Sequence, residues 1–247
     1  MKALLLLVVL AVACRAGIAQ VPETGRWQDL DFSATEVNRH DAAQYHAMLA
    51  DLAARHRLDD DAAVVARVRR VAATLIRSAI AVRPEARRWR WEVHTTSDPA
   101  TDAFCMAGGK LMIGSAFVRR LHLDDGELAT LIGHEVAHAV ASHQREFLSA
   151  AMHINPLPAT TLDVVIARLS SDLSLQIRLS TLSSIQESEA DQLGMVLAHR
   201  AGWPASAMVG FYRKLLVNEH PSALSGSHPS AASRLSMAKG MALLFGK

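Results

Sequence analysis

The chain has 247 residues, of which 50% are hydrophobic and 20% are charged, and its formal net charge is +2. This composition excludes a disordered chain, which would carry fewer apolar residues and more net charge. Aromatic residues make up only 5% of the chain, which argues against a stacking surface for nucleic acid. The small net charge gives no indication of a basic surface for nucleic acid either. The two cysteines are too few for a small domain held together by disulfides.

The first residues have the pattern of an export signal. Lys2 precedes an apolar run over residues 3–13. This run is too short to span a bilayer, which takes about 20 residues, but it has the length of the apolar region of a signal peptide. The sequence therefore predicts export, and the bacterial periplasm is the expected location.

Two processing routes are compatible with this segment. Cleavage after Ala19 would make residues 1–19 a signal peptide. Alternatively, residues 11–14 loosely resemble a bacterial lipobox, so that residues 1–13 would be removed and Cys14 would carry a lipid. The second route would allow the protein to associate with a membrane through Cys14.

Beyond this leader we expect a linker over residues 20–32 and a single domain over residues 33–247. Apolar residues recur at helical spacing in most of this domain, whereas alternation in a few short runs indicates strands. The predicted fold class is therefore α+β, mostly helical, with one small sheet. The predicted elements are helices over 33–57 and 60–82, a strand over 89–94, strands over 103–106 and 110–113 around a glycine pair, a helix over 124–147, a loop over 149–158, helices over 160–182 and 184–201, a loop over 221–230 and a last helix.

The sequence HEVAH at residues 134–138 lies inside the predicted helix over 124–147. Positions four apart share one face of a helix, so His134 and His138 can bind the same metal ion. Glu135 lies beside them, where it can take a proton from a metal-bound water. An exposed helix with incidental histidines is the simpler alternative. The flanking residues are apolar, however, and buried histidines need a polar partner, so we expect a metal site.

A zinc peptidase site needs a third protein ligand. His143 is one candidate, but the metzincin pattern requires a glycine three residues and a histidine six residues after the second histidine of the motif. Those positions hold Ala141 and Gln144. We therefore interpret His143 as a surface histidine.

The sequence ESEAD at residues 187–191 supplies the better candidate. Glu187 and Asp191 are again four apart on a predicted helix. Glu187 can therefore bind the metal while Asp191 accepts the ring N–H of a ligating histidine. Glu189 is expected to point elsewhere, into solvent. A plain acidic surface helix is the alternative, which the presence of HEVAH makes less favourable.

HEVAH together with ESEAD resembles the signature of the HtpX, BepA and Oma-type zinc metallopeptidases, relatives of the CaaX prenyl proteases. Residues 101–110 resemble the family's segment before the active-site helix, and residues 227–234 resemble its segment near the C-terminus. The blocks match in order and spacing over most of the chain. The chain looks closest in type to exported BepA-like or lipoprotein members. One departure is Asp102, where the family has asparagine.

This resemblance implies a gluzincin-type metallopeptidase domain that binds one Zn²⁺ ion per chain, with a small β-sheet beside the zinc cleft. It also implies that an extended or unfolded polypeptide substrate pairs with the edge of that sheet. The physical reason is that an edge offers unpaired N–H and C=O groups to an extended chain. The predicted edge strand consists of Gly109, Lys110, Leu111, Met112 and Ile113.

By the same resemblance, His228 approaches the metal. It would then either act as a catalytic residue that stabilises the oxyanion, or occupy the open coordination position and hold the enzyme inactive. A loop histidine that caps the last helix is the alternative. Arg234 is expected to support Glu187 or a neighbouring carboxylate. The segment over residues 149–182 is either a lid over the cleft or a fixed helical layer.

The predicted function is that of an exported zinc-dependent endopeptidase that hydrolyses unfolded or misassembled envelope proteins, with Glu135 as the general base. The alternative is a latent zinc-bearing chaperone or assembly factor with little proteolytic turnover. A purely structural zinc site is disfavoured, because such a site has no use for a base beside its ligands.

Overall fold

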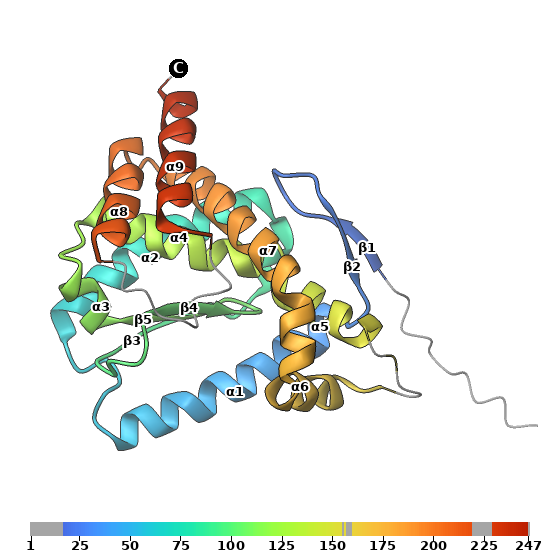
Figure 1. The fold of residues 1–247 in the computed structure, drawn as a ribbon. Helices are drawn as coiled ribbons and strands as arrows, with labels where there is room; N and C mark the ends of the chain where they lie inside the picture. The colour runs from blue at the N-terminus through green and yellow to red at the C-terminus, as the bar shows by residue number, and fades with distance from the viewer. Residues whose placement is uncertain (1–16, 155, 157–159, 219–228, 247) are drawn as a thin grey trace, which may run out of the picture.

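Helices surround a small three-stranded sheet in the computed structural model (Figure 1), which describes residues 17–154, 156, 160–218 and 229–246. The predicted fold class, mostly helical α+β, is confirmed. None of the helices in these described residues is long and apolar enough to cross a bilayer. In chain order the elements are β1 (Gly17–Gln20), β2 (Trp27–Leu30), α1 (Ala34–Ala54), α2 (Ala62–Val82), the 3₁₀ helix η1 (Pro84–Arg88), β3 (Glu92–Thr96), β4 (Ala103–Met106), β5 (Lys110–Gly114), α3 (Ser115–Arg120), α4 (Asp125–Val140), α5 (His143–Ile154), α6 (Leu162–Ser171), α7 (Leu173–Arg200), α8 (Ala205–Asn218) and α9 (Ala231–Phe245).

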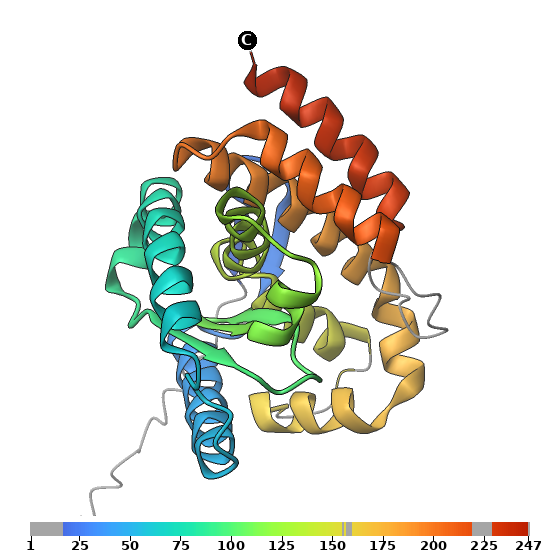
Figure 2. The same ribbon diagram turned by 90° about the vertical axis from the view of Figure 1, so that its left-hand side faces the viewer.

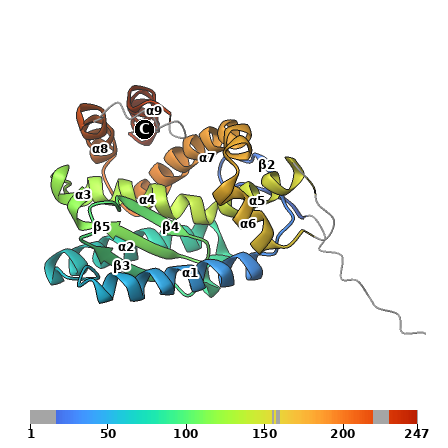
Figure 3. The ribbon, with the colours of Figure 1, turned by 60° about the horizontal axis from the view of Figure 1, so that its bottom comes forward.

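The helix α4, which carries HEVAH, lies at the centre of the fold. It packs on one face of the three-stranded sheet, while α1 covers the other face (Figure 3). The helix α7 crosses α4, and α8 and α9 lie side by side near the C-terminus (Figure 2). Leu128, Ile132 and Val136 of α4 are fully buried, so α4 supplies a large part of the main apolar core.

The order of strands corrects the predicted substrate edge. The order is β3-β5-β4, with β5 parallel to β3 and antiparallel to β4. The strand β5 is therefore central, and all of its residues are buried. The edge predicted at residues 109–113 is wrong, because this strand is paired on both sides; the hairpin pattern gave no sign that residues 92–96 pair with it from the far side. The outer strand that contacts α4 is β4.

The linker expected over residues 20–32 is instead an ordered hairpin. The strands β1 and β2 pair antiparallel, Val21 and Leu30 are buried, and β2 packs against α5. The side chain of Gln28 donates a 2.9 Å hydrogen bond to the carbonyl of Ala141. The hairpin was missed because four-residue strands are too short to show a clear alternation. Residues 1–16, which include most of the predicted leader, lie outside the described residues.

Asp124 and Glu127 begin α4 through a capping box, as the sequence predicted. The Glu127 N–H donates to Asp124 Oδ1 at 2.8 Å, and the Asp124 N–H donates to Glu127 Oε2 at 2.9 Å. The helix ends at Val140 instead of continuing to residue 147. Ser142, two residues later, adopts a φ of 61°, which no helical residue has. The predicted helix is therefore two helices, α4 and α5.

Other helix boundaries also differ from the prediction. The helix α5 extends through the first part of the loop expected over residues 149–158. The break expected near residue 183 lies at Asp172, so that α7 is longer than predicted and α6 shorter. The Asp172 carboxylate caps α7 by accepting from the Leu175 N–H at 3.0 Å. Aspartate at such a position is a helix-start signal that the apolar periodicity alone does not register.

For the segment over residues 149–182 the sequence allowed a lid or a fixed layer. Its described residues include α6 and the start of α7. Leu162, Val165 and Leu179 are buried in an apolar cluster that also contains Leu148 of α5. These contacts favour a fixed layer, because a mobile element has few buried apolar contacts.

Two glycines let α4 and α7 touch backbone to backbone beside the HEVAH sequence. A Cβ on Gly133 would lie 2.6 Å from the Gly194 carbonyl oxygen, and a Cβ on Gly194 would lie 2.6 Å from the His134 nitrogen. No side-chain rotation can relieve these contacts, because backbone atoms make them. The close crossing of the two helices therefore depends on both glycines.

Gly194→Ala should lower the free energy of unfolding by about 1–3 kcal/mol, because the added methyl group forces α4 and α7 apart. Urea unfolding followed by circular dichroism measures this loss. Gly240→Ala in α9 is the matched control, since a Cβ there meets no atom within 4 Å. Alanine's better helix propensity should make that variant more stable by up to about 1 kcal/mol. Equal effects of the two substitutions would contradict the close crossing.

Candidate metal centre

Three side chains converge where α4 crosses α7. His134 and His138 project from α4, one turn apart, and Glu187 projects from α7; each offers one ligand atom, and these atoms all lie within 4.8 Å of one another. His134 Nε2 lies 3.3 Å from Glu187 Oε2, and His138 Nε2 lies 3.6 Å from Glu187 Oε1. The structure thus brings together the three residues that the sequence predicted as ligands. Two imidazoles and one carboxylate are a ligand set suited to a catalytic metal ion.

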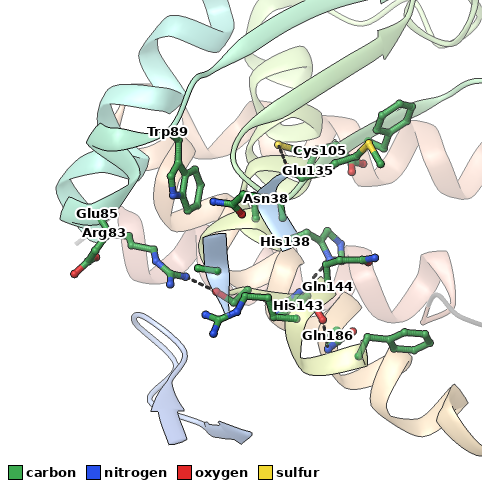
Figure 4. Close-up of a pocket in the computed structure, with 18 of the residues that line it drawn as sticks. Asn38, Arg83, Glu85, Trp89, Cys105, Glu135, His138, His143, Gln144 and Gln186 are labelled. Atoms are coloured by element: carbon green, nitrogen blue, oxygen red, sulfur yellow. Dashed lines mark hydrogen bonds between the residues drawn. The ribbon is translucent and has the colours of Figure 1, made fainter. Parts of the chain in front are cut away.

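Glu135 lies between two cavities that flank this group. The larger, of about 550 Å³, is bordered by β4 and Trp89 and reaches Glu135 and His138 (Figure 4). The smaller, of about 200 Å³, lies on the side of His134 and Arg234. Glu135 lines both cavities. The backbone of a bound polypeptide that extends from one cavity into the other would therefore pass this carboxylate.

Asp191 is buried behind His134. Its Oδ1 lies 2.8 Å from His134 Nδ1 and accepts a hydrogen bond from the Tyr212 hydroxyl at 2.8 Å. Arg234 donates to both carboxylate oxygens, at 2.6 and 2.8 Å. Arg234 was expected to support Glu187 or a neighbouring carboxylate. The structure shows the second arrangement, with Asp191 as the carboxylate. Asp191 fixes the ring of His134 with Nε2 turned toward the other ligand atoms.

The two histidines of α4 differ in protonation. Burial by itself would lower the pKa of His134, but hydrogen bonds with Asp191 and Glu187 outweigh burial and raise the pKa to about 10. Burial lowers the pKa of His138 to about 4, because its contact with Glu187 compensates only in part. Burial would raise the pKa of Asp191, yet His134 and Arg234 hold it well below its usual range. A metal ion that binds here must therefore displace a proton from His134.

His143 is buried, so its interpretation as a surface histidine is wrong. Its Nδ1 lies 3.0 Å from His138 Nδ1. The prediction assumed one continuous helix through residue 147, whereas α4 ends before Ser142 and His143 begins α5. Glu189, which was expected in solvent, is also buried and faces His143 Nε2 at 3.5 Å. The ESEAD segment of α7 thus directs Glu187 toward α4 and Glu189 toward His143 of α5.

The C-terminal block of the resemblance is described only in part. His228 lies outside the described residues, so its approach to the metal remains a prediction. Arg234 lies in the first turn of α9. Asp102, where the family has asparagine, lines the smaller cavity and pairs with Arg120 at 3.2 Å. Asp102 is thus placed beside the site but not among the three candidate ligands.

The site combines a helix that carries two histidines and a glutamate with a second helix that supplies a further carboxylate, and a small sheet lies beside them. This arrangement defines a gluzincin-type metallopeptidase domain. Residues 62–242 match the description Peptidase family M48. The chain belongs to this family. The resemblance drawn from HEVAH and ESEAD is therefore confirmed.

Curated relatives of the chain carry names of endopeptidases and proteases. The chain is 31% identical over 146 residues to Mitochondrial metalloendopeptidase OMA1 of Arabidopsis thaliana, a match that covers 58% of this chain and 30% of that protein. It is 36% identical over 115 residues to the Saccharomyces cerevisiae protein of the same name, covering 45% and 33%. It is 27% identical over 172 residues to Beta-barrel assembly-enhancing protease of Yersinia pestis, covering 63% and 35%. The chain thus spans about a third of the length of these relatives.

Proposed function

We propose that the protein is a zinc-dependent endopeptidase in which His134, His138 and Glu187 hold one zinc ion. The observation that carries this proposal is the convergence of their three ligand atoms within 4.8 Å, beside Glu135. Such a ligand set leaves one coordination position for water or substrate. Membership of Peptidase family M48 and the names of the relatives support the same reaction.

The residues around the site have distinct roles in this proposal. Zinc, when bound, supplies the Lewis acidity that lowers the pKa of the attacking water to about 7. Glu135 takes the proton from this water and then gives it to the leaving amine, so it acts first as general base and then as general acid. Asp191 and Arg234 hold His134 in a single orientation. The resemblance further suggests that His228 either stabilises the oxyanion or blocks the open position.

The proposed substrate is an extended or unfolded polypeptide that pairs with the edge of β4. The strand β4 is an outer strand of its sheet, and an outer strand offers backbone N–H and C=O groups to an extended chain. Trp89, Phe104 and Met106 line the larger cavity and provide apolar surface for substrate side chains. A folded protein presents few extended segments with unpaired backbone groups, so unfolded chains should be the better substrates.

We further propose that the protein is exported and acts on unfolded or misassembled envelope proteins. The apolar leader and the relatives named Beta-barrel assembly-enhancing protease support this setting. The hairpin favours lipoprotein processing among the two routes. Cleavage after Ala19 would remove three of the four residues of β1, whereas removal of residues 1–13 leaves the strand whole. A lipid on Cys14 would then hold the protein at a membrane.

Cleavage of casein, an unfolded protein, by the zinc-loaded chain tests the proposed reaction, with a folded protein of similar size as the comparison. Casein should be cut and the folded protein should stay intact. Peptide substrates N-methylated at single positions test the pairing with β4. Methylation of an N–H that bonds β4 should lower kcat/KM about tenfold, and methylation of the next N–H should not. A zinc-loaded chain that cuts no substrate would contradict the proposal and support the chaperone alternative.

Zinc affinity should rise about tenfold per pH unit between about pH 5 and pH 6.5, below the pKa of a zinc-bound water, because one proton must leave the protein as zinc binds. In this range His134, with its pKa raised to about 10, carries a proton, whereas His138, with its pKa lowered to about 4, is neutral. Calorimetric titration in buffers of different ionisation enthalpy measures the number of protons released, which should be close to one. An affinity that does not change with pH would contradict this assignment.

A further inference from the structure

We propose that His143 and Glu189 are positioning residues for the metal ligand His138, and that the N-terminal hairpin holds Glu189 in place. This inference rests on the proposed zinc site. We call the chain of contacts Glu189–His143–His138 the His143 relay. Neither His143 nor Glu189 was expected at the site from the sequence, yet both are buried beside it.

The contact between the two histidines fixes where their protons lie. His138 Nε2 faces the other ligands, 3.2 Å from His134 Nε2, so the ring binds a metal through Nε2 and must carry its proton on Nδ1. His138 Nδ1 lies 3.0 Å from His143 Nδ1. For this contact to be a hydrogen bond, His143 Nδ1 must accept, and His143 must carry its own proton on Nε2.

The Nε2 of His143 faces a carboxylate that is ready to accept this proton. Glu189 Oε2 lies 3.5 Å from it, which is longer than the roughly 2.7–3.2 Å of an ordinary N–H···O hydrogen bond, so the contact is electrostatic and not a direct hydrogen bond. A carboxylate that already accepts hydrogen bonds from Thr24 and Arg26 favours a proton on His143 Nε2, and this arrangement of protons lets His138 bind a metal.

The turn of the N-terminal hairpin anchors this carboxylate. Thr24 donates to Glu189 Oε1 at 2.7 Å, and Arg26 Nε donates to Glu189 Oε2 at 2.8 Å. Arg26 also forms two hydrogen bonds with Glu146 of α5, at 2.5 and 2.7 Å. Segments that lie far apart in the sequence thus meet at one guanidinium group, which joins the hairpin, α5 and α7.

Gln186 connects the same network to the backbone of His143 (Figure 4). Its amide nitrogen donates to the His143 carbonyl at 3.0 Å. The same nitrogen donates to Glu146 Oε2 at 2.8 Å. The side chain and the backbone of His143 are therefore both held by residues of α7. This double attachment leaves the imidazole of His143 little freedom to turn away from His138.

The His143 relay connects His138 to a carboxylate of α7, as Asp191 does for His134. Asp191 contacts His134 directly. Glu189 lies two residues earlier on α7 and therefore points to another side of the helix, because each residue turns the helix by about 100°. His143 bridges the gap that this rotation leaves. Both imidazole ligands thus end at an α7 carboxylate, an arrangement that orients a ligating histidine and strengthens it as a donor.

His143→Leu should raise the zinc Kd by about 10- to 100-fold, because it removes the acceptor that faces His138 Nδ1 but keeps apolar bulk in the buried site. His143→Asn should restore most of the affinity, since its side chain carries an acceptor oxygen at the δ position. His143→Gln, whose oxygen lies one bond further out, should not. His46→Gln, at an exposed histidine, is the matched control and should leave the Kd unchanged.

Competition with a chromophoric chelator measures the zinc Kd, and urea unfolding of the metal-free chain measures stability separately. If His143→Leu does not fold, Glu189→Gln decides the question: the relay predicts about tenfold weaker zinc binding, and unchanged binding overturns it. Equal losses of affinity in the leucine and asparagine variants would also overturn it, since they would show a packing role only. A wild-type chain that binds no zinc would instead overturn the proposed function on which the relay rests.

Discussion

Replacement of Glu135 by glutamine should lower kcat/KM for casein hydrolysis about 10³-fold while zinc affinity and stability change little. Glutamine keeps the shape of the side chain but cannot take a proton from the attacking water, and a positioned general base contributes about 10²- to 10⁴-fold. Glu135 is not among the three converging ligand atoms, so zinc should stay bound. Steady-state kinetics on fluorescently labelled casein measure the effect. Glu36→Gln, at the start of α1, is the control and should keep full activity.

Two results would contradict this role of Glu135. A Glu135→Gln variant with more than a tenth of the wild-type kcat/KM would mean that another group takes the proton. A variant that loses zinc together with its activity would mean that Glu135 is needed to hold the metal. Measuring zinc content and kinetics on the same preparation separates the two cases.

Asp191→Asn should lower the free energy of unfolding of the metal-free chain by about 3–5 kcal/mol, because it leaves the guanidinium of Arg234 buried without a counter-charge. The side chain of Asp191 is only 1% exposed and that of Arg234 only 11%. Asp125→Asn is the matched control. Asp125 also pairs with two arginines, but its side chain is 36% exposed, so its loss should cost no more than about 1 kcal/mol.

The effect of Asp191→Asn should also depend on pH. The pKa of Asp191 is depressed in the folded protein, so its contribution to stability is present above the unfolded pKa of about 4 and is lost as the pH falls further. Urea unfolding at several pH values should therefore show the difference between wild type and variant shrinking below about pH 4. A difference that stays constant down to pH 2, or a loss no larger than that of Asp125→Asn, would contradict a buried ion pair.

The part of the site that could be predicted from the sequence is the part set by helix geometry. His134 and His138 share a face because they are one turn apart, and Glu187 and Asp191 do so for the same reason. These local spacings needed no knowledge of how the helices cross. The structure adds the crossing itself, at the Gly133–Gly194 contact, which brings the two pairs together.

The residues that were missed depend on contacts that local spacing does not reveal. The burial of His143 follows from the end of α4 before Ser142, and the burial of Glu189 follows from Arg26 and Thr24, which lie far away in the chain. The edge strand was misplaced for the same reason, because the pairing of β3 with β5 is a tertiary contact. Periodicity predicts which face of an element is apolar, but not which element covers it.

Titration of the metal-free chain with zinc, with casein cleavage followed in the same samples, is the most direct test of a catalytic metal site at His134, His138 and Glu187. Cleavage should be absent without zinc, should rise in proportion to added zinc, and should level off at one ion per chain. Cleavage that persists in the metal-free chain, or a chain that binds one zinc ion and cuts nothing, would contradict the zinc-peptidase assignment.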